Sequence, residues 1–313
     1  MKCRVCGKQA NIRLPQYNTA LCSEDFTLFF EKRVATTIRK YRLIGEEEKT
    51  LVAVSGGKDS LSLWRLLNGL GISADGIYID LGIHEYSRVS FEKTKAMAES
   101  LRRTLYSFSL PDAFTKGIKD LSGIMRRPPC SLCGMIKRYV MNRACIEHGY
   151  SVLATGHNLD DEASALLGNL LHWKEEYLWK KGVSLDAEGA HLARKVKPLF
   201  LCSEKETAAY AVMTGIDYVY EECPYSVGAK TLLYKGLLNR AEEESPTTKL
   251  VFMKGYLKRV RQGGLTKDER EPKSLCGACG YPSYAELCSF CRLMERFGTT
   301  DTLSFSIHTH SPS

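Results

Sequence analysis

Hydrophobic and polar positions alternate along the chain in a pattern that predicts strands and helices in turn. Apolar runs of strand length occur at 51–54, 76–79, 105–108, 152–154 and 218–220. Stretches with helical periodicity separate them, at 61–70, 91–103, 136–148 and 161–171. Strands that are apolar throughout and alternate with helices indicate a parallel sheet covered by helices on both faces. We therefore predict an α/β fold of the Rossmann-like type.

The same pattern predicts further helices outside this alternating region. Before it, Phe26, Phe30, Val34 and Ile38 recur at every fourth residue, which indicates a helix over 23–41 with Ser23 as its N-cap. After it, residues 226–272 are helical in pattern and rich in lysine and arginine. The tail from about Thr299 is polar, and we expect it to be frayed.

Charge and composition narrow the possible partners and locations. The 313-residue chain carries 44 Lys and Arg against 36 Asp and Glu, a net charge of +8. This excess favours a polyanionic partner, although a modestly basic enzyme without one is an alternative. No apolar stretch approaches the roughly 20 residues of a membrane helix. The first residues contain no apolar segment typical of a signal peptide, so we expect a cytoplasmic protein with reduced thiols and no membrane association.

Twelve cysteines then favour metal binding over disulfides. The strongest signal is a C-x2-C-x8-C-x2-C spacing near the C-terminus, typical of a zinc ribbon and formed by Cys276, Cys279, Cys288 and Cys291. Cys3, Cys6 and Cys22 predict a second zinc site with a fourth ligand near residue 25. Cys145 and Cys202 lie in apolar surroundings and are expected in the core.

The stretch LVAVSGGKDS, residues 51–60, joins a predicted strand to a predicted helix. Gly56 and Gly57 permit a tight turn, Ser60 opens the helix whose positive end favours phosphate, and Lys58 adds a cation. The loop differs from the Walker A motif because Asp59 follows the lysine. It predicts a phosphate-binding loop, and a plain strand-to-helix turn is the alternative.

Three further cysteines are placed to meet at the carboxyl edge of the sheet. Cys130 and Cys133 lie at a predicted helix start, where the helix dipole and Lys137 or Arg138 are expected to lower their thiol pKa. Cys223 follows the last predicted strand. A [4Fe–4S] cluster with one iron lacking a protein ligand, a redox disulfide and a structural zinc are all compatible with this spacing.

SGGKDS after an apolar strand resembles the PP-loop of the ATP pyrophosphatases, which adenylate an oxygen of their substrate and release pyrophosphate. The resemblance implies that Ile79, with neighbouring Asp80, meets the adenosine and that Gly156 closes over the nucleotide. Asp161 is expected to hold Mg²⁺ or orient the attacking group, and simple complementation of a helix dipole is its alternative. The implied ATP-binding residues are Ala53, Val54, Ser55, Gly56, Gly57, Lys58, Asp59, Ser60, Ile79 and Gly156.

PPCSLCGMIKR, GHNLDDEA and ECPYS, in that order after SGGKDS, resemble the tRNA 2-thiouridine synthetases of the TtuA and Ncs6 group. The resemblance implies a [4Fe–4S] cluster on Cys130, Cys133 and Cys223, and Lys137, Asp161 and Asp59 as catalytic residues. The expected reaction is adenylation of a tRNA uridine C2 oxygen, then sulfur transfer through the cluster to give 2-thiouridine. The segment after ECPYS is more similar to the branch that modifies T-loop position 54 than to the wobble-position (34) branch.

The resemblance also implies cofactors, partners and an organisation along the chain. We expect ATP, Mg²⁺, the cluster and two Zn²⁺, with Asp25 completing the N-terminal zinc site where the group usually has cysteine or histidine. tRNA, a ubiquitin-like sulfur carrier or another sulfur donor, and a second copy in a homodimer are the expected partners. The expected units are an N-terminal zinc finger and helix (1–46), the PP-loop domain (47–225), a basic helical extension (226–272), a zinc ribbon (273–297) and a tail (298–313).

Three alternatives keep parts of this interpretation. A cluster-free PP-loop thiolase would use Cys130 or Cys133 as a persulfide and then form a disulfide. A zinc-finger RNA-binding protein with an inactive PP-loop would bind tRNA without chemistry, although the intact SGGKDS argues against it. A PP-loop amidotransferase-like enzyme acting on a small molecule would leave the zinc sites and the basic helix without a role.

Overall fold

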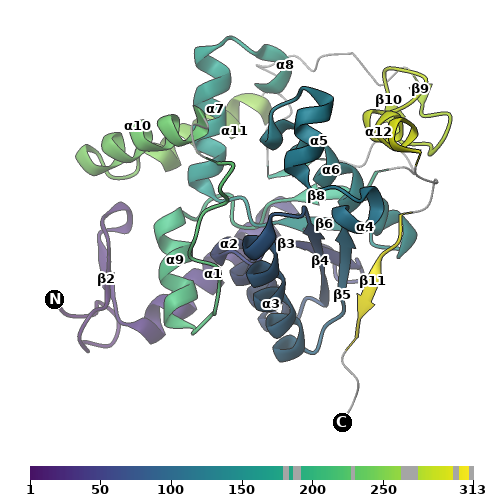
Figure 1. The fold of residues 1–313 in the computed structure, drawn as a ribbon. Helices are drawn as coiled ribbons and strands as arrows, with labels where there is room; N and C mark the ends of the chain where they lie inside the picture. The colour runs from purple at the N-terminus through teal and green to yellow at the C-terminus, as the bar shows by residue number, and fades with distance from the viewer. Residues whose placement is uncertain (179–182, 186–191, 227–229, 262–273, 299–302, 310–313) are drawn as a thin grey trace.

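The computed structural model describes residues 1–178, 183–185, 192–226, 230–261, 274–298 and 303–309, with a seven-stranded sheet at its centre (Figure 1). In order across the sheet, its strands are β11 (Ser306–His308), β5 (Leu105–Ser109), β4 (Ala74–Asp80), β3 (Thr50–Val54), β6 (Val152–Thr155), β8 (Arg194–Val196) and β7 (Ser184–Leu185). The five inner strands run parallel, and the two edge strands run antiparallel to their neighbours. The predicted α/β fold is therefore confirmed.

Helices cover both faces of the sheet, because alternate strand residues face two different cores. Val52 and Tyr78 belong to one core, and Leu51 and Ile77 to the other. The first core is covered by α1 (Ser23–Tyr41), α2 (Lys58–Gly69), α3 (His84–Leu101), α7 (Leu159–Leu171), α8 (Glu175–Leu178), α9 (Glu204–Met213), α10 (Lys230–Glu244) and α11 (Thr248–Arg261). The second is covered by α4 (Leu110–Phe114), α5 (Ile118–Met125), α6 (Pro129–Glu147) and α12 (Ser289–Phe297). Among the helices described, none has both the length and the apolarity needed to cross a bilayer.

One predicted strand was wrong, and three strands of the sheet, β7, β8 and β11, were not predicted. Residues 218–220 lie outside the sheet, although the Val219 N–H donates to the Gly56 carbonyl at 2.9 Å and so borders the loop after β3. The strand that pairs with β6 on this side of the sheet is β8 instead. Two of its three residues, Arg194 and Lys195, are charged. A strand this short and this polar gives no apolar run, so its position could not be predicted from the sequence.

The N-terminal segment is a small hairpin followed by the predicted helix. The hairpin consists of β1 (Ile12–Leu14), the 3-10 turn η1 (Pro15–Tyr17) and β2 (Thr19–Leu21). The N-cap of α1 is Cys22 rather than Ser23, and its Sγ accepts the Asp25 N–H at 3.5 Å. Phe26, Phe30 and Val34 are fully buried, as their spacing predicted.

The C-terminal part contains the cysteine-rich segment and a strand that we did not expect. The segment pairs β9 (Ser274–Leu275) with β10 (Pro282–Ser283) ahead of α12. In Figure 1 it lies on the opposite side of the sheet from the N-terminal hairpin. The expectation of a frayed tail is wrong for residues 306–308, because β11 pairs with β5 and the Ser107 hydroxyl hydrogen-bonds the His308 ring at 2.9 Å. The helical prediction for 262–272 lies outside the described residues.

Candidate active site and metal centres

The loop between β3 and α2 is fixed by its own side chains. Gly56 has φ +75°, and a Cβ there would lie 2.6 Å from the Ser90 carbonyl oxygen, so glycine is required. The Ser55 N–H donates to Ser60 Oγ, and the Ser60 hydroxyl donates to the Gly57 carbonyl, both at 3.1 Å. α2 begins at Lys58, which places the positive end of the helix at the loop. This arrangement is a preformed site for an anion.

The loop after β6 packs directly on this site. A Cβ on Gly156 would lie 2.9 Å from the Ser60 nitrogen, so the two backbones touch. Asn158 caps α7 and donates from Nδ2 to the Asp59 carboxylate at 3.2 Å. Burial raises the pKa of Asp59, and the nearby Lys58 cation opposes this shift. Gly156 and Asp59, which we predicted as site residues, therefore lie side by side.

Three consecutive acids at the start of α7 are paired with lysines from α10, α11 and the segment after β8. Asp160 accepts from Lys249 of α11 at 2.5 Å. Asp161 accepts from Lys235 of α10, and Glu162 from Lys197, each at 2.8 Å. The second carboxylate oxygen of Asp161 accepts the Asn158 N–H at 3.2 Å, which completes a capping box. Part of the predicted basic extension is therefore occupied in docking onto α7.

Glu204, the first residue of α9, joins this acidic cluster to the loop. Its two carboxylate oxygens accept from Lys58 at 2.7 Å and from Lys235 at 2.9 Å. Burial would raise the pKa of Glu204, but the hydrogen bonds from the two lysines lower it to about 2. Glu204 and Lys235 were missed in the sequence analysis. A capping box, SEKE, marks the start of α9, yet nothing in the sequence indicates which lysines Glu204 meets.

Ser55 of the loop and two of the three central cysteines line one cavity of about 130 Å³. Cys133 and Lys137 of α6 enter it from one side, and Cys223 also lines it. The predicted ATP-binding residues Ala53, Val54, Ser55 and Ile79 complete the wall. Asp80, which we expected near the adenosine with Ile79, lines a separate hollow of about 1110 Å³ beside α3, α4 and α5.

Cys130 lies next to this group. It is exposed, and its thiol donates to the Tyr225 carbonyl, two residues beyond Cys223, at 3.0 Å. Burial raises the pKa of the Cys133 thiol against the opposing influence of Lys137, so the lowered pKa that we expected there is wrong. The helix start is as predicted, but the desolvation of Cys133 outweighs the nearby positive charge.

The donor set formed by Cys130, Cys133 and Cys223 fits an iron–sulfur cluster better than a single zinc. Among the described residues, metal-binding side chains gather within 4.8 Å of one another in two groups, and neither contains these cysteines. A tetrahedral zinc holds all its sulfurs around one ion, whereas each thiolate of a [4Fe–4S] cluster binds a different iron. Two thiols that line the cavity and a third beside it, not gathered within 4.8 Å of one another, are therefore compatible with the cluster.

The N-terminal group brings together Cys3, Cys6, Cys22 and Asp25. The Cys3 and Cys22 thiols donate to one oxygen of Asp25 at 3.0 and 3.1 Å, and the Cys6 and Cys22 sulfurs lie 3.6 Å apart. Hydrogen bonds from Cys6, Cys3 and Cys22 lower the pKa of Asp25, so it is a carboxylate. Three sulfurs and one oxygen form a donor set that zinc accepts.

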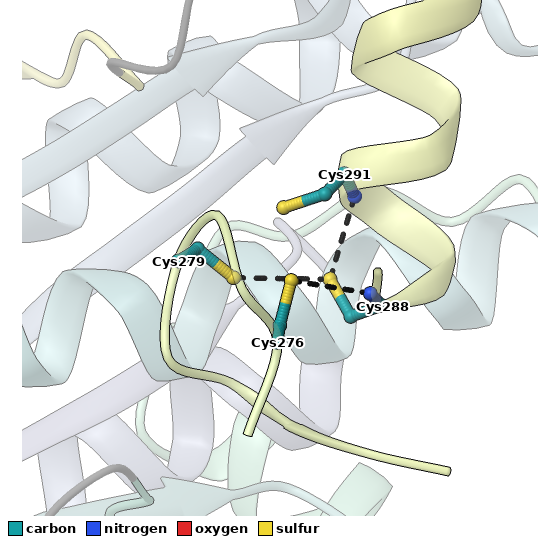
Figure 2. A group of neighbouring side chains, drawn as sticks. All are labelled: Cys276, Cys279, Cys288 and Cys291. Carbon is teal, nitrogen blue, oxygen red and sulfur yellow. Dashed lines mark hydrogen bonds between the residues drawn. The ribbon is translucent and has the colours of Figure 1, made fainter. Parts of the chain in front are cut away.

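The C-terminal group brings together all four predicted ligands, Cys276, Cys279, Cys288 and Cys291 (Figure 2). The Cys279 and Cys288 sulfurs lie 3.8 Å apart, and the Cys288 N–H donates to the Cys276 sulfur at 3.2 Å. Burial opposes ionisation of Cys276, but hydrogen bonds from backbone N–H groups, that of Cys288 first, lower its pKa to about 6. Four sulfurs in this arrangement suit tetrahedral zinc.

The C-terminal group also contacts the helix that carries the central cysteines. Phe290, inside the cysteine-rich segment, stacks on Tyr139 of α6 with ring centroids 4.1 Å apart and an interplanar angle of 8°. Tyr139 lies two residues beyond Lys137 on the same helix. The C-terminal segment therefore braces α6 beside the cavity.

Comparisons with known families agree with this geometry. Residues 27–227 match the PP-loop domain family. Residues 2–27 match a family described as the N-terminal LIM domain of the 2-thiouridine synthetase TtuA.

Similar full-length proteins are tRNA-modifying enzymes. The tRNA-5-methyluridine(54) 2-sulfurtransferase of Thermus thermophilus is 43% identical over 94% of this chain and 91% of its own. The enzyme of the same name from Pyrococcus horikoshii is 42% identical over 98% and 97%. Among solved structures, the U34-tRNA thiolase NcsA of Methanococcus maripaludis, solved with its [4Fe-4S] cluster, matches with a TM-score of 0.81 and 27% identity, over 97% of this chain and 99% of that one.

Proposed function

We propose, for a chain that belongs to the PP-loop family of tRNA 2-thiouridine synthetases, that it is an ATP-dependent tRNA-uridine 2-sulfurtransferase acting at T-loop position 54. The observation that carries this proposal is the shared cavity in which Ser55, the first residue of the phosphate loop, meets Cys133, Lys137 and Cys223. An adenylating site and a sulfur-handling site that open into one cavity allow both half-reactions on one bound uridine.

The phosphate loop binds ATP and directs its α-phosphorus toward the cavity. Ser55, Gly56, Gly57 and Ser60 supply backbone N–H groups and hydroxyls at the positive end of α2. Lys58 is held by Glu204 at 2.7 Å and supplies a cation that can turn to the phosphates. Asp161, or Asp161 together with Asp59, provides carboxylate for the Mg²⁺ that accompanies ATP.

Lys137 acts on the uridine. The C2 oxygen of the base attacks the α-phosphorus, which forms an adenylated base and releases pyrophosphate. A lysine fixed on α6 and directed into the cavity stabilises the negative charge that develops during this attack. The reaction ends when sulfur replaces the adenylated oxygen at C2 and AMP leaves.

Cys130, Cys133 and Cys223 are the residues that hold the [4Fe–4S] cluster in this proposal. When bound, such a cluster supplies an iron without a protein ligand, where sulfur can be held beside the base. Cys133 is partly buried at this wall of the cavity. Lys137 lies close enough to the Cys133 thiol to oppose the rise of its pKa, so one lysine can serve the base and the sulfur site.

Lys235 and Glu204 act as positioning residues. Lys235 binds one oxygen of Asp161 while the Asn158 N–H binds the other, which fixes the plane of that carboxylate. Glu204 holds Lys235 and Lys58 together at the loop. α10 thereby contributes directly to the geometry of the ATP site.

Two zinc ions, a tRNA substrate, a sulfur donor and a second copy of the chain complete the proposed assembly. The N-terminal and C-terminal groups each hold one Zn²⁺, with Asp25 as the oxygen ligand of the first. tRNA is the substrate, a ubiquitin-like carrier or another donor supplies sulfur, and the chain acts as a homodimer in the cytoplasm. We keep the proposed division into units 1–46, 47–225, 226–272, 273–297 and 298–313.

Wobble position 34 is the second candidate target, because the structurally similar NcsA is a U34-tRNA thiolase. That protein is 27% identical to this chain, whereas the position-54 enzymes are 42% and 43% identical. The higher identity favours position 54.

Pyrophosphate release tests the adenylation step. We expect the full chain to release pyrophosphate from ATP in a tRNA-dependent manner, and Lys137→Met to reduce the rate by about 10²–10³-fold, the usual effect of losing one transition-state donor. Lys119→Met, an exposed lysine of α5, is the matched control and should retain the rate. A wild-type chain that binds tRNA without releasing pyrophosphate would instead be an inactive RNA-binding protein.

A further inference from the structure

A groove of about 460 Å³ runs between α1 and α11, outside the site described above. Four basic side chains line it, and none of its lining residues is acidic. The basic residues are Lys32, Arg33, Lys40 and Lys254. Tyr17, Phe29 and Tyr41 contribute aromatic rings to the same wall. These basic residues come from one helix on each flank of the PP-loop domain, α1 and α11.

Arg33 lines the groove, and the carboxylate of Glu206 balances its charge. Its guanidinium forms a salt bridge with Glu206 and donates to the Leu201 carbonyl at 2.7 Å. It lies 4.4 Å from the ring centroid of Tyr17 and 5.5 Å from that of Phe29, so it holds both rings in place. Contacts with Arg33 therefore fix the rings of Tyr17 and Phe29.

The three lysines are available to a ligand. Lys32, Lys40 and Lys254 are all exposed, and within the described ranges none of them forms a salt bridge with a carboxylate. Lys40 lies 5.6 Å from the ring centroid of Tyr41. By contrast, Lys235 and Lys249 of the same helical extension are bound to Asp161 and Asp160. The groove therefore keeps a net positive charge that the protein itself does not neutralise.

We propose that the α1–α11 groove binds the sugar-phosphate backbone of the tRNA substrate, with a base or ribose against the aromatic wall. The proposal rests on the proposed function and locates a substrate-docking surface for it. Lysines that line a groove and carry no carboxylate partner are suited to phosphate contacts, and aromatic faces accept bases without sequence preference. A free nucleotide is a poorer occupant, because the groove lacks a glycine-rich loop like that after β3.

The groove also borders the segments that organise the ATP site. Leu201 and Glu206, which anchor Arg33, flank Glu204, which holds Lys58. Leu250 lines the groove, and its neighbour Lys249 holds Asp160 at the start of α7. RNA in the groove therefore contacts the same two segments that position the phosphate loop and the acidic cluster.

The experiment compares two triple variants of the full chain. The groove variant is Lys32→Ala, Lys40→Ala, Lys254→Ala. The control is Lys95→Ala, Lys119→Ala, Lys205→Ala, which removes three exposed lysines from α3, α5 and α9. Unmodified tRNA transcript is the probe, and its Kd is measured against salt concentration. We expect the groove variant to bind about tenfold or more weakly at about 0.1 M salt, with a log–log salt slope shallower by about 2–3, the value for three lost phosphate contacts.

Kinetics separates docking from chemistry. Because the groove touches no reacting atom, its variant should show a higher KM for tRNA with an unchanged kcat, and the control should match the wild type. If both variants bound tRNA equally weakly, or if neither bound it more weakly than the wild type, the groove would not be the tRNA-docking surface. Thiolation by the wild type would in that case still support the proposed function. A wild-type chain that fails to bind tRNA would overturn both.

If the groove variant is unstable, ultraviolet crosslinking of the wild-type protein to tRNA tests whether the groove contacts the RNA. Crosslinks from tRNA to peptides containing Phe29 or Tyr41 would support the groove. Crosslinks confined to peptides outside α1 and α11 would contradict it.

Discussion

Glu204 illustrates how single residues connect distant parts of this chain. It joins Lys58 of the phosphate loop to Lys235 of α10, and Lys235 in turn fixes Asp161. A charged hydrogen bond of this kind contributes about 1.5–3 kcal/mol when partly shielded from water. The side chains that shape the ATP site thus include residues far from the loop in sequence.

Lys235→Ala should therefore weaken the ATP reaction. Asp161 and Glu204 each lose a cation, and we expect kcat/KM for ATP to fall about tenfold or more. Lys235→Arg should restore most of the loss because it keeps the charge. Lys230→Ala, on the same helix and exposed, is the control. Steady-state pyrophosphate release measures the effect, and equal activity of Lys235→Ala and Lys230→Ala would remove Lys235 from the site.

Glu204 also predicts a pH dependence of stability. Its pKa falls from the ordinary value of 4.5 to about 2 in the folded protein. A carboxyl whose folded pKa is lowered stabilises the fold fully above its unfolded pKa, and that contribution is lost as pH falls from 4.5 toward 2. The stability difference between the wild type and Glu204→Gln should thus shrink as pH falls from about 6 to 3.5. Urea unfolding across this range measures it, and a pH-independent difference would exclude the ion pairs as its source.

The zinc content of the protein should depend on Asp25, the one oxygen donor of the N-terminal group. Two groups of four donors imply two zinc ions per chain, one of which needs Asp25. Asp25→Ala should lower the count to about one, whereas Asp25→Cys should keep it near two. The neighbouring Glu24→Ala is the control, because Glu24 pairs with Lys8 outside the group. Metal analysis of purified protein gives the counts, and an unchanged count in Asp25→Ala would mean that another residue completes the site.

At the element scale, the close approach of two loops organises the phosphate site. The loop after β6 touches the first turn of α2 at Gly156, which leaves no room for a side chain. Because the neighbouring atoms belong to the backbone of Asp59 and Ser60, they cannot move aside as a side chain could.

Gly156→Ala should accordingly displace the phosphate loop. We expect ATP affinity to fall about tenfold, in line with the 1–3 kcal/mol that overpacking usually costs. Gly236→Ala in α10 is the control, because a Cβ there meets nothing within 4 Å. Calorimetric titration of ATP into both variants measures the effect. Wild-type affinity in Gly156→Ala would show that the loop adapts.

The elements differed in how well the sequence predicted them. Helix α1 was predicted with its bounds, because four apolar residues at a spacing of four define one buried face. The four inner strands from β3 to β6 were predicted because they are apolar on both faces. β8 and β11 were not, since Arg194, Lys195 and His308 give no apolar run. Short polar strands acquire their structure from pairing with a sheet that already exists.

At the scale of the whole molecule, the cysteine spacings predicted the four cysteines of the C-terminal group and the three of the N-terminal group, because short spacings leave little conformational freedom. The family resemblance suggested Asp25 as the fourth member of the N-terminal group. The meeting of Cys223 with α6 depends on the fold, and family resemblance supplied what spacing alone left open. The lysine pairs of the acidic cluster were beyond prediction, because lysines are common on any basic surface and their partners are set by helix docking. The sequence therefore indicated the chemistry but not the charge network that positions it.

The most direct test of the central claim is the amount of 2-thiolated uridine at position 54 of tRNA after reaction. Anaerobically prepared chain, ATP, sulfide and a tRNA transcript would be combined, and the nucleosides of the T-loop fragment analysed by mass spectrometry. The account predicts 2-thiouridine at position 54 that requires ATP and is abolished in Cys223→Ala, with position 34 unmodified. Thiolation at position 34, or undiminished thiolation in Cys223→Ala, would contradict it.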